Sequence, residues 1–221
     1  MIVLLGVLVV VVGFVTRRHP LLVVLAAALV TSIAAGLDVV AAISALGKAF
    51  AQNRTMAVGW LVLPVIGLLE RAGLKERAQA LVRSIRSATP SRILLVYFVL
   101  RQIAAALGLT SLGGHAQMVR PLIAPMAEAS AERLASELTP AQRFYVRAHA
   151  AAADNIGLFF GEDIFVAIGS ILLMKGFLAQ NGYEIEALDF AVWAIPTAIL
   201  AFLIHAGRLL RLDRRFTKEG P

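Results

Sequence analysis

Cysteine is absent from the 221-residue chain, which excludes disulfides and thiolate metal sites. No pair among the four histidines has the spacing of metal ligands, so no metal centre is predicted. Acidic residues are scarce, 14 against 21 basic ones, and the net charge is +7. The basic residues lie between apolar runs and form no aromatic-basic face, so nucleic acid is not the expected partner.

Apolar residues, in contrast, are abundant. They make up 59% of the chain, and the mean hydropathy is +0.81, above that of ordinary soluble domains. Several apolar runs have about 15 to 23 residues, close to the length that a helix needs to cross a bilayer. The composition therefore predicts an all-α integral membrane protein that crosses the lipid bilayer several times.

About five spans are predicted. They cover roughly residues 1–16, 20–43, 55–70, 139–178 and 189–207, and 44–54 form a polar connector. The first run has no preceding basic residues and no small-residue cleavage site, so it is expected to be a retained span. Basic residues follow the last span, whereas the loop 179–188 is acidic, so the C-terminus is expected to be cytoplasmic and the N-terminus outside.

Residues 71–88 differ from the spans because basic residues are frequent there. Leu74, Ala78, Val82 and Ile85 recur at helical spacing, with cationic side chains elsewhere around the helix. This pattern predicts an amphipathic helix on the cytoplasmic surface. The alternative is a solvated, charged loop.

The segment "LTSLGGHAQMVRPLIAPMAEA" from residue 109 is unlike a membrane span, because it contains Gly113-Gly114, a histidine, an arginine and two prolines. It predicts a re-entrant hairpin over 89–127 with its tip at the two glycines, which tolerate a chain reversal. Unwound backbone at membrane depth is tolerated only within protein or beside a water-filled cavity. The hairpin therefore predicts a cavity.

A second polar interruption, "ADNIGLFFGEDIF", begins at residue 153 and predicts that the helix over 139–178 is broken between Asp154 and Asp163. Ionisable groups within a membrane usually line a pathway or pair with one another. A hairpin, a broken helix and an odd number of crossings are typical of one half of an inverted-repeat transporter. Residues 1–88 are then the expected scaffold and 89–221 the expected transport unit.

The motifs "SLGGHAQMVRPLIAPMAEA" and "ADNIGLFFGED" resemble those of a family of small bacterial membrane proteins, described as one subunit of a two-component 5-oxoproline (pyroglutamate) transporter. The arrangement of spans also resembles one inverted repeat of the ion-transporter superfamily, whose members work by an elevator mechanism. These resemblances imply a bacterial inner-membrane location, a second membrane subunit, and symport of a small organic anion with sodium or protons. The Ser-Asn-Thr tip signature of the superfamily is absent, and Thr110-Ser111 with Gly113-Gly114 stand in its place.

Candidate substrate-binding residues lie mainly at the hairpin tip. Amide groups at a helix start favour anions, His115 could bond a lactam oxygen, and Arg120 could attract a carboxylate. The full set is Thr110, Ser111, Gly113, Gly114, His115, Arg120 and Asn155. In the alternative, the glycines only make a tight turn and His115 bonds nearby backbone. Arg101 is expected to have a structural acidic partner, and in the alternative it attracts the substrate carboxylate.

Candidate ion-coupling residues offer carboxylate, amide or hydroxyl oxygens, which suit sodium. They are Ser111, Asp154, Asn155, Glu162 and Asp163. No cofactor is expected beyond a sodium ion. In the alternative, Asp154 caps the following half-helix, and Glu162 or Asp163 pairs with Arg101 or Arg120.

Two other classes of function compete with the transporter. One is a non-transporting assembly or regulatory membrane subunit. The other is an intramembrane hydrolase that uses His115 with Asp154 or Glu162. Ser111, four residues before His115, is its candidate nucleophile, although a nucleophile and its base must lie within hydrogen-bond reach.

Overall fold

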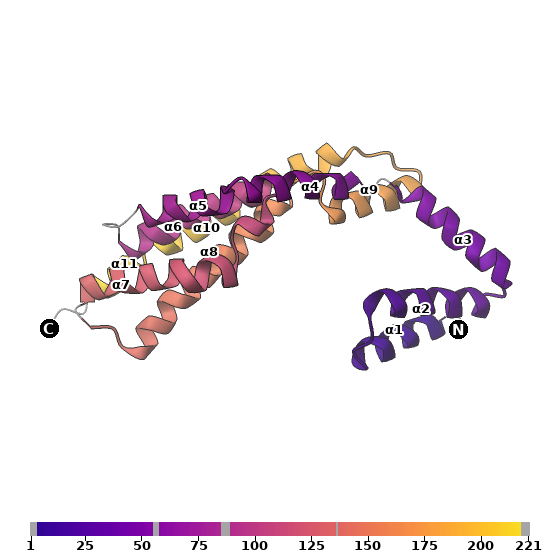
Figure 1. The fold of residues 1–221 in the computed structure, drawn as a ribbon, viewed down its shortest axis with the longest axis horizontal. Coiled ribbons are helices and arrows are strands. Elements are labelled where there is room, and N and C mark those ends of the chain that lie inside the picture. The colour runs from indigo at the N-terminus through magenta and orange to yellow at the C-terminus, as the bar shows by residue number, and fades with distance from the viewer. Residues whose placement is uncertain (1–3, 55–57, 85–88, 136, 218–221) are drawn as a thin grey trace. The chain divides into compact units, whose positions relative to one another are not determined.

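The computed structural model describes residues 4–54, 58–84, 89–135 and 137–217, and every regular element in these ranges is a helix (Figure 1). The all-α prediction is therefore confirmed. Contacts divide the chain into two compact units, Met1–Thr55 and Met56–Pro221. The candidate site lies entirely within the second unit.

The first unit contains α1 (Leu5–Val15), α2 (Pro20–Ala34) and α3 (Val39–Gln52). The predicted span over 20–43 is wrong in its extent, because the chain turns after Ala34 through Gly36, whose φ is +84°. The carboxylate of Asp38 then accepts a hydrogen bond from the Ala41 amide at 2.6 Å and caps α3. The predicted connector over 44–54 is mostly helical for the same reason, since a good N-cap starts α3 before it.

The second unit begins with α4 (Val58–Arg71) and α5 (Leu74–Arg83). Gly73, with φ of +85°, separates them. The amphipathic prediction for α5 holds where the structure describes it, since Leu74 and Ala78 are partly buried while Glu76 and Arg77 are exposed. The Val82 side chain and Ile85 lie outside the described part of the chain.

Three long helices form the centre of this unit: α6 (Pro90–Ala106), α8 (Pro140–Glu162) and α10 (Ala187–Leu210) (Figure 1). α6 and α10 are antiparallel, because the Gln102 side chain bonds the Ala198 carbonyl while Ser91 bonds Asp213. Glycines bring α8 close to α6. A Cβ at Gly161 would lie only 2.5 Å from the carbonyl oxygen of Gln102.

The chain reverses after α6 and returns beside it. A short 3₁₀ turn, η3 (Thr110–Leu112), leads into the π-helix η4 (His115–Ile123) and then α7 (Ala124–Ala135). Gly108 and Gly114 have φ of +77° and +105°, which only glycine adopts readily. Pro121 lies inside η4. It has no N–H and crowds the carbonyl four residues earlier, which favours the wide helix there.

The helix over 139–178 is broken, as predicted, but the break lies later than the predicted position between Asp154 and Asp163. α8 is continuous to Glu162, so Asp154, Asn155 and the following glycines lie within a regular helix. The interruption comes later, at 163–168, before α9 (Gly169–Gln180). The polar side chain of Asp154 does not break the helix because it finds partners on neighbouring elements, so its own backbone hydrogen bonds are kept.

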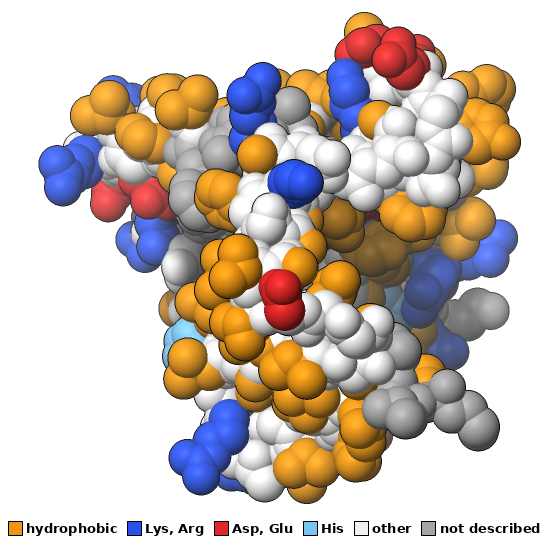
Figure 2. All heavy atoms as spheres, turned by 90° about the vertical axis from the view of Figure 1, so that its right-hand side faces the viewer, with side chains coloured by type: hydrophobic (Ala, Val, Ile, Leu, Met, Phe, Trp, Pro, Cys, Tyr) orange, Lys and Arg blue, Asp and Glu red, His pale blue; other side chains and the backbone are white. Residues whose placement is uncertain are grey.

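Among the described residues, one helix is long and apolar enough to cross a membrane: Ala187–Phe216, with a mean hydropathy of 2.1. It includes α10 and all but the last residue of α11 (Asp213–Thr217). Shorter apolar helices correspond to α1, α2 and α3. Large hydrophobic side chains are widely exposed, including Trp193 at 78%, and Figure 2 shows many on one face of the surface. These helices are compatible with membrane association.

Candidate functional site

A buried ion pair lies where the chain reverses. Arg101 on α6 and Asp154 on α8 are 4% and 2% exposed, and Arg101 Nε lies 2.9 Å from Asp154 Oδ1. The Nε–H is not aimed at the carboxylate, so this contact is an ion pair without a well-directed hydrogen bond. Burial makes the pair depend on its neighbours, because two charges have been removed from water.

Two further donors satisfy the Asp154 carboxylate. The Tyr97 hydroxyl donates to Oδ1 at 2.5 Å, and the Gly114 amide donates to the same oxygen at 3.0 Å. Tyr97 and Arg101 are four residues apart on α6, so they lie on one helical face. Asp154 therefore joins α6 to the hairpin turn.

Arg101 also holds the turn directly. Its Nη1 donates to the Thr110 carbonyl at 2.7 Å. Gly113 and Gly157 make room for this side chain: an added Cβ would lie 2.7 Å from Arg101 Cδ in the first case and 3.1 Å from Arg101 Cβ in the second. The expectation of a structural acidic partner for Arg101 agrees with this geometry, and the partner is Asp154.

His115 is the first residue of η4 and contacts side chains of α8. Its Nε2 lies 2.9 Å from Asn155 Oδ1, to which it can donate, and 3.7 Å from Asp154 Oδ2. The alternative in which His115 bonds only nearby backbone is therefore not what the structure shows. Its side chain is 40% exposed.

A polar cavity of 460 Å³ opens beside His115. Its lining comes from η4, α7 and α8: His115, Val119, Arg120, Ala124, Pro125, Glu128, Arg147 and Ala151. Arg147 is held by Glu128 through two hydrogen bonds, of 2.5 and 3.0 Å. Arg120 is exposed, and no acidic side chain of the described residues lies within salt-bridge distance of it. Arg120 is thus an un-neutralised cation at this cavity.

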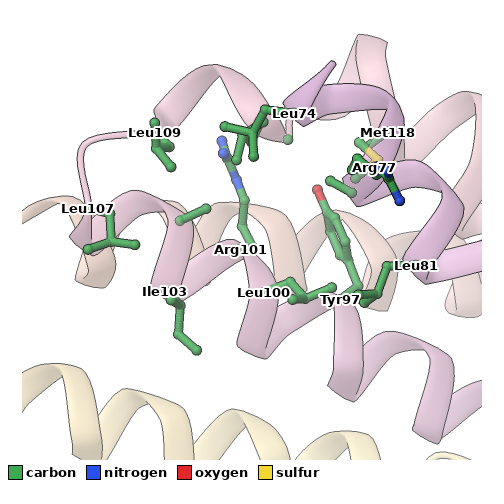
Figure 3. Close-up of a pocket in the computed structure, with 14 residues that line it drawn as sticks. Leu74, Arg77, Leu81, Tyr97, Leu100, Arg101, Ile103, Leu107, Leu109 and Met118 are labelled. Carbon is green, nitrogen blue, oxygen red and sulfur yellow. The ribbon is translucent and has the colours of Figure 1, made fainter. Parts of the chain in front are cut away.

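A second cavity, of 310 Å³, is mainly apolar and lies between α5, α6 and the turn (Figure 3). Tyr97, Arg101 and Gly113 contribute to its lining. The buried ion pair therefore borders the apolar cavity through Arg101. His115, which lines the polar cavity, approaches Asp154 from that cavity.

Other predicted residues have different positions. Asp154 lies in the interior of α8, so the alternative in which it caps a half-helix is wrong. The Ser111 hydroxyl is buried and has no hydrogen-bond partner, so it is not paired with His115. In the described ranges, neither Glu162 nor Asp163 forms a salt bridge with Arg101 or Arg120, and no cluster of three or more His, Asp or Glu residues could hold a metal ion.

Three residues of this region were not predicted: Tyr97, Glu128 and Arg147. Only Tyr97 had a signal in the sequence, because it precedes Arg101 by one helical turn. Glu128 and Arg147 are 19 residues apart, and nothing local indicates that they meet.

The chain belongs to the family described as "Protein of unknown function (DUF969)", which matches residues 1–217. No curated protein and no solved structure matches it.

Proposed function

We propose that this protein is a membrane subunit of a secondary transporter for a small organic anion. The observation that supports this best is Arg120, which faces the polar cavity beside His115 and has no acidic partner among the described residues. At 460 Å³ the cavity falls within the range of about 300–1,000 Å³ typical of small-ligand sites. An unpaired guanidinium there suits a carboxylate.

We propose 5-oxoproline as the substrate, on the basis of the motif resemblance. Its carboxylate would bind Arg120, and its lactam group would bind His115, which Asn155 orients. The first amides of η4 have no acceptor within the helix and add a favourable environment for an anion. Thr110, Ser111, Gly113 and Gly114 would shape the turn that presents these groups.

Coupling to sodium or protons is assigned to the same region. The positive charge of Arg101 neutralises the Asp154 carboxylate. A proton or cation bound to this carboxylate would compete with Arg101 and weaken the hydrogen bond that Asp154 accepts from the Gly114 amide. Ser111 supplies a buried hydroxyl without a hydrogen-bond partner, and the exposed residue Asn155 supplies an amide oxygen that contacts His115 Nε2. Glu162 and Asp163 are the remaining candidates.

The proposed membrane arrangement has about five spans, a re-entrant hairpin over 89–127 and a surface helix over 71–88, with the N-terminus outside the inner membrane and the C-terminus cytoplasmic. At roughly 1.5 Å per residue, the 15 residues of α2 extend about 22 Å, so the span near 20–43 cannot consist of α2 alone across a hydrocarbon core of about 30 Å. We propose that a second membrane subunit supplies the other half of an inverted-repeat, elevator-type assembly and covers part of the exposed apolar surface.

The test is uptake of labelled 5-oxoproline by cells that express this chain with and without the second membrane subunit. Saturable uptake should require both proteins. Arg120→Gln should raise KM roughly tenfold or more, because one charge-assisted carboxylate contact is lost. Arg92→Gln is the matched control, since Arg92 is exposed on α6 and does not line the cavity.

Unchanged uptake by Arg120→Gln at equal expression would contradict this substrate site. If Arg120, Ser111 and Asp154 variants all kept normal kinetics but changed assembly of the complex, the assembly-subunit function would be favoured instead. The hydrolase alternative has no support from the geometry, because Ser111 and His115 are not hydrogen-bonded.

A further inference from the structure

The apolar cavity beneath α5 is not used by the proposed anion site. Leu, Ile, Ala and Met side chains form most of its lining. Tyr97 and Arg101 also line it (Figure 3), but the Tyr97 hydroxyl donates to Asp154, and the Arg101 guanidinium pairs with Asp154 and donates to the Thr110 carbonyl. The available contacts therefore suit an apolar occupant.

A cation lies at the edge of this cavity. Arg77 of α5 contributes to the lining, is exposed, and has no acidic side chain within salt-bridge distance in the described part of the chain. Lys75 and Arg83 are on the same helix, against a single acid, Glu76. A basic amphipathic helix of this kind is attracted to anionic lipid surfaces.

Apolar surface continues outward from the cavity. Leu81, Ile103 and Leu107 line it and are 52%, 55% and 61% exposed. A narrow apolar chain could therefore enter from the surrounding lipid while a charged group at its end stayed near Arg77. A partner helix is about 10 Å across and would require an open groove, whereas this cavity holds 310 Å³.

We propose that this cavity binds one acyl chain of an anionic phospholipid, with the phosphate on Arg77. The proposal rests on the membrane placement given above, but not on the substrate or on transport. The acyl chain would contact Leu112 and Gly113 and support the turn that holds Arg101. A lipid that leaves this cavity would thus loosen the hairpin turn.

Native mass spectrometry of the purified full-length protein tests the proposal, after delipidation and addition of phosphatidylglycerol or phosphatidylethanolamine. Phosphatidylglycerol should be retained in preference. Arg77→Gln should reduce this preference roughly fivefold, because that is about the contribution of one basic residue to binding at an anionic surface. Arg83→Gln is the control, because Arg83 has the same charge on the same helix but does not line the cavity. Ala78→Trp should fill the cavity and reduce binding of both lipids.

Circular dichroism shows whether each variant folds, and Ala78→Phe replaces Ala78→Trp if the latter does not. Equal retention of the two lipids would overturn the proposal. Equal loss in Arg77→Gln and Arg83→Gln would do so as well, since the attraction would then be diffuse. Complete exclusion of lipid when the second membrane subunit is co-purified would assign the cavity to that protein instead. Absence of 5-oxoproline uptake would not affect these outcomes.

Discussion

Asp154→Asn isolates the charge of the buried cluster. Asparagine has nearly the same size, and its side-chain oxygen can still accept from Tyr97 and Gly114. The change therefore removes mainly the negative charge that faces Arg101 Nε at 2.9 Å. Arg101 is only 4% exposed, so water cannot replace the lost partner.

The expected cost follows from this burial. Removing one partner of a buried ion pair destabilises a protein by about 3–5 kcal/mol, because the other charge is left uncompensated. Much of that penalty belongs to the unpaired guanidinium. The double variant Arg101→Gln/Asp154→Asn should therefore be more stable than the sum of the single effects predicts, with a coupling of about 1–3 kcal/mol.

The assay is equilibrium unfolding of the purified protein in detergent, followed by circular dichroism for the wild type, both single variants and the double variant. Glu184→Gln makes the same change of charge in an exposed loop. It should change the free energy of unfolding by no more than about 0.5 kcal/mol. If Asp154→Asn were as stable as Glu184→Gln, or if the two single effects were additive, the ion pair would not hold the turn as argued.

Four other substitutions test the packing and capping of the second unit by the same unfolding measurement. Gly113→Ala should destabilise by about 1–3 kcal/mol, because its Cβ would lie 2.7 Å from Arg101 Cδ. Gly207→Ala, which has open space around it in α10, should stabilise by up to about 1 kcal/mol, and a similar loss in both variants would contradict the steric argument. Gly161→Ala should separate α8 from α6, since its Cβ would meet backbone at 2.5 Å, and wild-type stability would refute that close approach. Thr139→Ala should lose about 1 kcal/mol with the capping box of α8, and no loss would show that the cap is not stabilising.

Local sequence features account for where several helices begin. Thr89-Pro90 and Thr139-Pro140 begin α6 and α8, because proline suits the first helical position, and the second pair completes a capping box with Gln142. The apolar spacing around Leu74 identified α5. Such features depend on neighbours within one or two turns, so the sequence is enough to read them.

The length of an apolar run predicted helix boundaries less well than these local features did. It predicted one span over 20–43, where the turn at Gly36 and the cap at Asp38 end one helix and start another. Polarity misplaced the break in the helix over 139–178, which it predicted between Asp154 and Asp163 and which lies at 163–168. In both cases short-range backbone chemistry or a tertiary partner outweighed the average hydrophobicity of the segment.

The sequence by itself determined that the protein is helical, rich in apolar surface, and reversed near Gly113-Gly114, because composition, periodicity and glycine are local properties. Only the tertiary structure decided that Asp154 meets Tyr97, Arg101 and the Gly114 amide. Those groups are up to 57 residues apart, and their meeting depends on how closely α6 and α8 pack. Which residue pairs with a buried charge is decided by how the helices pack, and the sequence of one segment does not specify that packing.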